Sequence, residues 1–127
     1  MEIKTHQSIN RELCGVPLAV EEGFSRVEMK TVPRMAVDGS GLVHGGFVFG
    51  LADHAAMIAV NHPHVVLGAS RVKFLKPVKA GETVTAEARV EQAEGKKREV
   101  RVICARDAEP VFEGTFTCFV LDRHVLD

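Results

Sequence analysis

Hydrophobic and polar residues alternate through most of the second half of the chain, a pattern typical of strands with one buried face. Residues 82–92, 98–106 and 111–121 are each predicted to be a strand, and residues 65–77 precede them as another. The predicted inward faces of strands 82–92 and 98–106 carry Val84, Ala86, Ala88, Val90, Val100, Val102 and Cys104. Short turns at 79–81, 94–96 and 107–110 predict antiparallel pairing.

The first part of the chain holds shorter elements. Residues 9–14 predict a short helix, with Ser8 or Thr5 as its cap and Gly15 as its end. Residues 18–32 are predicted to be extended.

One long helix is predicted between the two groups of strands, over residues 45–61, and His62-Pro63 is expected to end it. The helix is apolar nearly all round, so we expect it to be buried. Either the sheet wraps around it or a second subunit covers it. The element order predicts an α+β fold with the helices on one side of an antiparallel sheet.

Asp53 is the exception inside this helix, because its neighbours are almost all apolar. Burial of an ionised carboxylate without partners is costly, so such a group shifts its pKa or has a specific task. Asp53 is therefore a candidate functional residue. The alternative is an Asp that hydrogen-bonds a neighbouring loop.

Composition narrows the classes of protein. The chain has 127 residues, which fits a single domain over 1–127. A net charge of −1 argues against a general nucleic-acid binder. Three widely spaced cysteines argue against a disulfide framework or a zinc site. With no signal-peptide core and no uninterrupted membrane span, we expect a cytoplasmic protein.

Two motifs resemble a known family. Residues 43–55, VHGGFVFGLADHA, are similar to the H-G-G-x(6)-D signature of hotdog-fold acyl-CoA thioesterases, with the phenylacetate-pathway (PaaI-like) branch as the best match. Residues 71–84, RVKFLKPVKAGETV, resemble the F-L-x-P-x(3)-G-(D/E)-x-V segment of the same fold. The two motifs follow each other in the order that the family has.

The resemblance implies a curved antiparallel sheet around one central helix, with a short N-terminal helix before it. It implies two subunits joined edge to edge, active sites between subunits, and a homodimer or homotetramer. The implied reaction is hydrolysis of an acyl-CoA thioester, with no metal or organic cofactor.

The resemblance also assigns roles to residues. Asp53 matches the catalytic carboxylate, either as general base on water or as nucleophile. Gly45 matches the oxyanion donor through its N–H, which the helix start favours. Gly46 and His44 complete the substrate-binding loop. The alternative for Gly45 and Gly46 is that the two glycines only ease a tight turn or a helix–strand contact.

The resemblance also bears on Asp38 and Ser70. Asp38 stands where many relatives have Asn, so it is either a second carboxylate that raises the pKa of Asp53 or a plain Asp-Gly turn. Ser70 falls near a hydroxyl position that some relatives use. His54 is expected at a subunit interface. His62 and His64 could suggest a metal pair, but their i, i+2 spacing in a loop without a nearby carboxylate or Cys argues against it.

A local basic cluster lies near the second motif. Arg71 and Lys73, with Lys76 and Lys79, would complement the phosphates of coenzyme A, or they form a solvated strand face. Phe74 is expected to contact substrate, and the acyl pocket candidates are Phe47, Phe49, Met57 and Phe74.

Two other functions compete with thioester hydrolysis. A hotdog dehydratase would need a His paired with a carboxylate in a different motif, which the chain lacks. A non-catalytic acyl-CoA sensor would be expected to carry a DNA-binding segment as well, for which the chain has no length.

Overall fold

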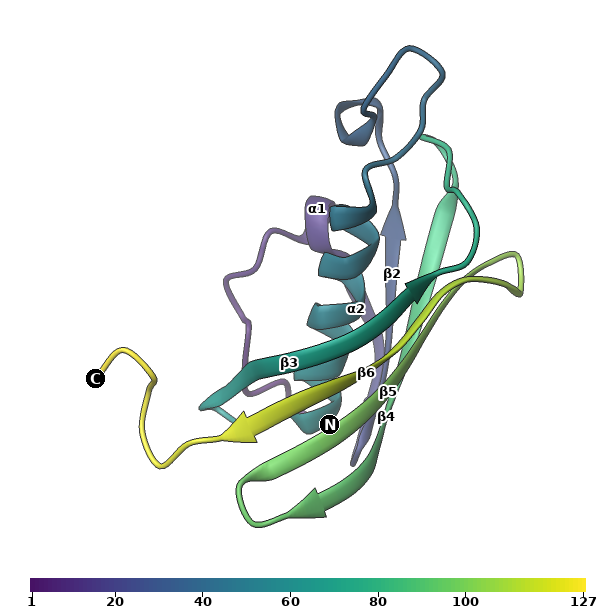
Figure 1. Cartoon of the computed structure of the whole chain (residues 1–127). Helices are drawn as coiled ribbons and strands as arrows, with labels where there is room; N and C mark the ends of the chain where they lie inside the picture. Colours follow the sequence, from purple (N-terminus) through teal and green to yellow (C-terminus); the bar gives the residue numbers. More distant parts are fainter.

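The computed structural model describes residues 1–127, and one antiparallel sheet of six strands packs against a single long helix (Figure 1). The strand order across the sheet is β1-β2-β4-β5-β6-β3. In chain order the elements are α1 (Arg11–Cys14), β1 (Val16–Glu21), β2 (Phe24–Lys30), the 3-10 turn η1 (Pro33–Met35), α2 (Gly45–Val60), β3 (Val65–Phe74), β4 (Thr83–Glu94), β5 (Lys97–Arg106) and β6 (Glu109–Val120).

The sheet curves around α2 (Figure 1). Its inner face is the predicted one, because the alternating residues of β4 and β5 from Val84 to Ala88 and from Val100 to Cys104 are fully buried. Burial of one face on every second residue fixes the strand register. The α+β hotdog architecture expected from the sequence is confirmed.

Helix α2 lies against the inner face, and most of its residues from Leu51 to Ala59 are buried. The buried Ser25 hydroxyl of β2 donates to the carbonyl of Ala55 at 2.6 Å, which ties the middle of the helix to the sheet. The helix ends at Val60. Its C-cap Asn61 has a left-handed backbone conformation, and His62-Pro63 follows.

The N-terminal segment covers the side of α2 that the sheet leaves open (Figure 1). The Asn61 side chain holds it, by accepting from the N–H of Lys4 and donating to the carbonyl of Glu2, both at 2.7 Å. Helix α1 is shorter than predicted. Its cap is Asn10, whose side chain accepts from the N–H of Leu13, so the expected caps Ser8 and Thr5 were wrong.

Strand β3 forms one edge of the sheet, because it pairs only with β6. Residues 68–71 are exposed along it. The strand ends at Phe74, three residues earlier than predicted. Strand β6 begins earlier than predicted, at Glu109, because Asp107 and Ala108 make a two-residue turn with positive φ.

Candidate functional site

The first two residues of α2 present free backbone donors. Gly45 and Gly46 follow His44, which caps the helix without a side-chain hydrogen bond. Neither glycine N–H donates a hydrogen bond within the chain, because the first N–H groups of a helix have no intrahelical acceptor. The helix dipole adds partial positive charge at this end. The helix start therefore favours an oxygen atom that gains negative charge.

An apolar cleft of about 340 Å³ opens at Gly45. A Cβ on Gly45 would lie 3.0 Å from Cε1 of Phe74, so a larger residue here would require the Phe74 ring to shift. The Phe74 ring is in turn held edge-on by Phe112, with ring centroids 5.1 Å apart. The cleft is lined by Val43, Gly45, Val48, Phe74, Leu75, Lys76, Pro77, Val78 and Val111.

Asp53 lies just over two helical turns further along α2 and is half-buried among apolar residues. Its carboxylate makes no hydrogen bond or ion pair within the chain, and burial raises the pKa of this carboxyl above its ordinary value of 3.8. The alternative, an Asp53 side chain that hydrogen-bonds a neighbouring loop, is therefore wrong. An available, destabilised carboxylate is suited to act on a proton or a carbonyl carbon.

Two thiols lie within electrostatic range of Asp53. Burial, and then the charge of Asp53, raises the pKa of the Cys14 thiol. Burial, Asp53 and Glu99 together raise the pKa of Cys118 to about 12. Both thiols are therefore neutral at neutral pH, and they add no charge to the carboxylate's surroundings.

Gly45 and Asp53 do not meet within one chain. They are eight positions apart on one straight helix, which places them about 12 Å apart along its axis. A single thioester carbonyl cannot contact both groups of the same helix. The chain alone thus presents two separate candidate groups, one at the helix start and one at its middle.

Asp38 lies in an exposed loop before α2, where it caps its own turn. Its Oδ1 accepts from the N–H of Ser40 at 2.9 Å and from the Ser40 hydroxyl at 2.6 Å. These bonds lower the pKa of Asp38. Burial is the cause of the raised pKa of Asp53, and Asp38 does not contribute to it within the chain.

The histidines have mainly structural positions. The His44 ring covers Gly46, where a Cβ would lie 2.9 Å from two of its atoms. His54 is buried under the chain's own N-terminal segment, with Nδ1 3.1 Å from the carbonyl oxygen of Cys14, so its predicted interface position was wrong. His62 Nδ1 accepts from the N–H of His64. No group of three His, Cys, Asp or Glu side chains is placed to hold a metal ion.

The predicted residues of β3 separate onto two faces. Ser70 lies on the same side as Val72 and Phe74, which face the helix, while Arg71 and Lys73 face outward. Arg71 and Lys73 make no ion pair within the chain. Of the pocket candidates, Phe74 lines the cleft, whereas Met57 is a core residue with 1% exposure.

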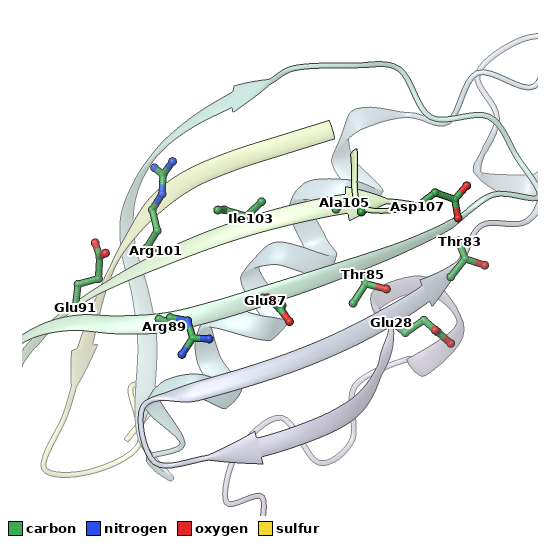
Figure 2. Close-up of a pocket in the computed structure, with 11 residues that line it drawn as sticks. Glu28, Thr83, Thr85, Glu87, Arg89, Glu91, Arg101, Ile103, Ala105 and Asp107 are labelled. Carbon is green, nitrogen blue, oxygen red and sulfur yellow. The ribbon is translucent and has the colours of Figure 1, made fainter. Parts of the chain in front are cut away.

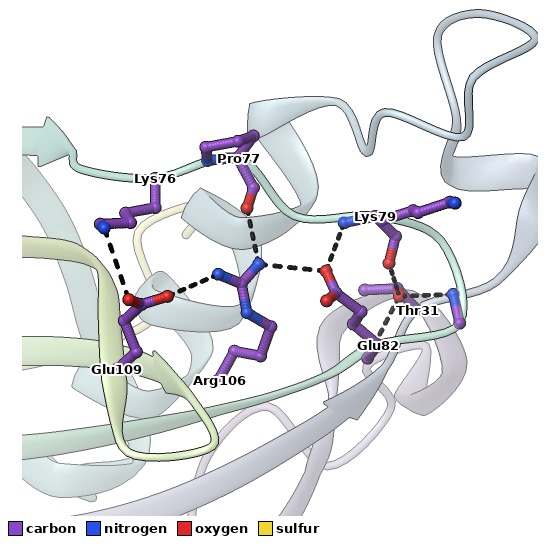
Figure 3. A network of polar contacts seen from close by, with 8 residues as sticks. Thr31, Lys76, Pro77, Lys79, Glu82, Arg106 and Glu109 are labelled. Carbon is purple, nitrogen blue, oxygen red and sulfur yellow. Dashed lines mark hydrogen bonds and ion pairs between the residues drawn. The ribbon is translucent and has the colours of Figure 1, made fainter.

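A polar network next to the cleft was not predicted (Figure 3). Arg106, at the end of β5, contacts Glu82, Glu109 and the carbonyl of Pro77. Lys76 joins the network through Glu109 at 3.4 Å. Pro77 and Glu82 belong to the second sequence motif, but Arg106 and Glu109 lie outside it, and only the fold brings them to it.

A larger hollow, of about 630 Å³, lies on the outer face of the sheet over β2, β4 and β5 (Figure 2). Acidic and basic side chains alternate along it, including Glu87 and Arg101. None of its lining residues belongs to α2. The candidate residues Gly45 and Asp53 lie on the other, helix side of the sheet.

The sequence profile of the Thioesterase superfamily matches residues 40–108, more than half of the chain, and this stretch includes Gly45, Asp53 and the Phe74–Glu82 connection. The chain belongs to the thioesterase superfamily. Its structure is similar over its whole length to that of an uncharacterized protein from Pyrococcus horikoshii, with a TM-score of 0.99, 51% identity and 98% of that chain covered.

Other members of the superfamily are less similar or longer. The structure of Escherichia coli PaaI has a TM-score of 0.81 and 27% identity, over 88% of this chain and 83% of that one. In sequence, the acyl-coenzyme A thioesterase PaaI of E. coli is 40% identical over 75 residues, 58% of this chain and 53% of PaaI. PaaI is thus a distant relative.

Two further relatives carry different names. Methylthioribose-1-phosphate isomerase of Aquifex aeolicus is 52% identical over 123 residues, 96% of this chain and 27% of the isomerase. The transcription factor FapR of Caldanaerobacter subterraneus is 28% identical over 85 residues, 67% of this chain and 42% of FapR. The chain thus spans from about a quarter to about half of the length of these curated relatives. None of the helices has the length and apolar character needed to traverse a lipid bilayer.

Proposed function

We propose that the chain is an acyl-CoA thioesterase whose active site forms between two copies. The observation that carries the proposal is the pair of half-sites on α2: a free amide at Gly45 beside an apolar cleft, and an unpaired, half-buried carboxylate at Asp53. The superfamily membership supports this reading, and so does the likeness to PaaI.

In the proposed reaction, the thioester carbonyl of the substrate accepts a hydrogen bond from the Gly45 N–H. Negative charge develops on that oxygen when the carbonyl carbon is attacked, and the helix start stabilises it. Water adds to the carbonyl carbon, the carbon–sulfur bond breaks, and the products are a carboxylic acid and the CoA thiol.

Asp53 of a second copy supplies the other half. As a general base it takes a proton from the attacking water, and the proton passes to the departing sulfur. As a nucleophile it attacks the carbonyl itself, and water then hydrolyses the anhydride that results. Both routes need the carboxylate in its ionised form. Partial burial destabilises that form and so makes it more reactive.

The free edge of β3 supports the association of two copies. An exposed edge strand presents unpaired N–H and C=O groups, and pairing with another strand satisfies them. Two β3 edges joined around a two-fold axis would extend the sheet into a homodimer, and dimers could then form a tetramer. Light scattering that gives only a 13.9 kDa monomer would contradict this part of the proposal.

Within this proposal, Phe74 contributes to the substrate cleft, His44 and Gly46 shape its entrance, and Ser70 lies on the helix-facing side of the edge strand. Arg71 and Lys73 point outward without an ion pair, which leaves them available to CoA phosphates. Asp38 is assigned the role of shaping the loop that leads into the helix.

Release of free thiol from a panel of acyl-CoAs tests the proposal. Hydrolysis of at least one acyl-CoA by the wild-type protein, and its loss in Asp53→Asn, is the expected result. Equal turnover by the two proteins would contradict the role of Asp53.

A second candidate function is reversible binding of acyl-CoA without hydrolysis, and the similarity to FapR transcription factors favours it. The same cleft would then hold the ligand without catalysis. Measurable binding of CoA esters, together with no turnover of any member of the panel, would support this function over the first.

A further inference from the structure

The wall of the cleft that faces Gly45 is a connection between strands. Residues 75–82 join β3 to β4, and Leu75 to Val78 line the cleft together with Phe74. Neither Gly45 nor Asp53 belongs to this wall, because both lie on α2. The position of the wall can therefore affect binding separately from the reacting groups.

Main-chain hydrogen bonds hold the connection near its two ends. The N–H groups of Leu75 and Lys76 both donate to the carbonyl of Val111, at 2.8 and 3.2 Å. Towards the other end, the N–H of Ala80 donates to Gly41 at 2.8 Å, and the Thr31 hydroxyl accepts from the N–H of Gly81 at 3.0 Å. Pro77 lies between these anchors and has no N–H of its own.

Arg106 binds the carbonyl oxygen of Pro77 (Figure 3). Its Nη1 donates to the Pro77 carbonyl at 2.7 Å and to Oε1 of Glu82 at 3.1 Å. Its Nη2 donates to Oε1 of Glu109 at 2.7 Å. One planar guanidinium thus joins the apex of the connection to two carboxylates, an arrangement that the Arg fork allows and a Lys ammonium does not reproduce.

The next carbonyl is held from a different direction. The carbonyl of Val78 accepts from the N–H of Val43 at 2.8 Å, and Val43 lies two residues before Gly45. The consecutive carbonyls of Pro77 and Val78 therefore link Arg106, on one side, to the entrance of α2 on the other. Together these two contacts tie the cleft wall to β5 and to the segment that leads into α2.

We propose that Arg106 is a positioning residue for substrate binding: it fixes the Leu75–Val78 wall against the start of α2. The proposal rests on the proposed function, because it assigns the wall to acyl-CoA binding. The reacting groups are on the helix and keep their positions. Loss of Arg106 should therefore weaken binding of the substrate and of the transition state by the same amount. That change raises KM and leaves kcat nearly unaltered.

Three variants test the proposal. Arg106→Gln removes the fork, and Arg106→Lys keeps the charge and one donor group. Arg101→Gln is the matched control, because Arg101 lies on the same strand and forms an ion pair with Glu113 at 2.9 Å, away from the connection. Each of the three variants replaces a single arginine of β5, so they differ mainly in which contacts are lost.

The first readout is amide hydrogen exchange by mass spectrometry, which needs no activity. We expect faster exchange in peptides covering residues 74–82 for Arg106→Gln, a smaller increase for Arg106→Lys, and none there for Arg101→Gln. Unchanged exchange over residues 74–82 in Arg106→Gln would overturn the proposed anchoring.

The second readout is thioester hydrolysis. For Arg106→Gln we expect KM to rise by about tenfold with kcat within about twofold of wild type, with Arg106→Lys intermediate. A fall in kcat at constant KM, or the same result for Arg101→Gln, would overturn the proposal.

A wild-type protein without hydrolytic activity would refute the proposed function and not the positioning role. Affinity for S-hexyl-coenzyme A, a thioether that cannot be hydrolysed, then replaces KM in the comparison. A roughly tenfold loss of affinity in Arg106→Gln supports the role, and an unchanged affinity refutes it.

Discussion

Gly45 and Asp53 lie on the same helix, α2, eight positions and about 12 Å apart along its axis. Each is a half of the proposed site, and a rigid helix keeps them apart. The spacing means that one chain can present an oxyanion donor or a carboxylate to a given thioester, but not both. A second copy is the simplest source of the missing half.

Asp53 should lower the free energy of unfolding at pH values at which its carboxyl group is ionised. Because burial raises its pKa above 3.8, the stability that the protonated form contributes is present below that value and is lost as pH rises through the folded-state pKa. Asp53→Asn should therefore melt a few degrees higher than wild type at pH 7, and the difference should shrink towards pH 4.

The same substitution should lower kcat by roughly 100- to 10,000-fold, because it removes the base or the nucleophile. Thermal melts and thiol-release kinetics on the same preparations measure both effects. Lower activity together with lower stability would instead identify Asp53 as a structural residue.

Two substitutions at Gly45 separate its N–H from its small size. Proline removes the N–H, and proline is accepted at the first position of a helix. His44 already has φ −61° and ψ 130°, which a residue before proline favours. Gly45→Pro should lower kcat by roughly 100- to 1,000-fold, the effect of losing an oxyanion donor.

Gly45→Ala is the control for this prediction, since it keeps the N–H and adds a Cβ close to Phe74. Its effect should fall mainly on KM, because Phe74 must shift within the cleft. If kcat of Gly45→Pro were no lower than that of Gly45→Ala, the N–H would have no catalytic role.

The N-terminal segment should loosen in mild acid. Burial lowers the pKa of His54, and also of His6, whose ring stacks on His54 with centroids 6.4 Å apart. The neutral rings stabilise the fold above pH 6.5, and this stability is lost as pH falls below 6.5 towards the folded-state pKa values.

Melting temperature measured from pH 7.5 to 5 checks this prediction. The wild type should lose stability over that range, and His6→Gln should lose less, because its side chain does not titrate. Identical pH dependence in the two proteins would contradict a contribution from His6.

Local patterns sufficed for much of the fold. Alternation placed β4 and β5 with the correct faces inward, and the apolar run placed α2 within one residue of its observed end. The start of α1 was missed, because the Asn10 side chain caps it in place of the expected Ser8 or Thr5. The hydrogen bonds of the Asn61 side chain to the N-terminal segment were not predicted either, because they join positions far apart in the chain.

The candidate site divides in the same way. The free N–H of Gly45 follows from helix geometry, so it could be predicted from the sequence. The apolar neighbours of Asp53 marked it as a candidate, but whether it bonds a loop was left open until the structure showed it without a partner. The burial of His54 and the contacts of Arg106 depend on segments far apart in the chain, 40 positions between His54 and Cys14 and 29 between Arg106 and Pro77. No local pattern encodes such contacts.

The central claim, a site shared between copies, is tested most directly by mixing two inactive variants. Gly45→Pro and Asp53→Asn, expressed together with different tags and purified through both, give assemblies that contain each variant. A mixed dimer has one site with an intact Gly45 N–H and an intact Asp53, so the account predicts recovery of about half of the wild-type turnover. Mixed assemblies as inactive as the two parents would contradict it.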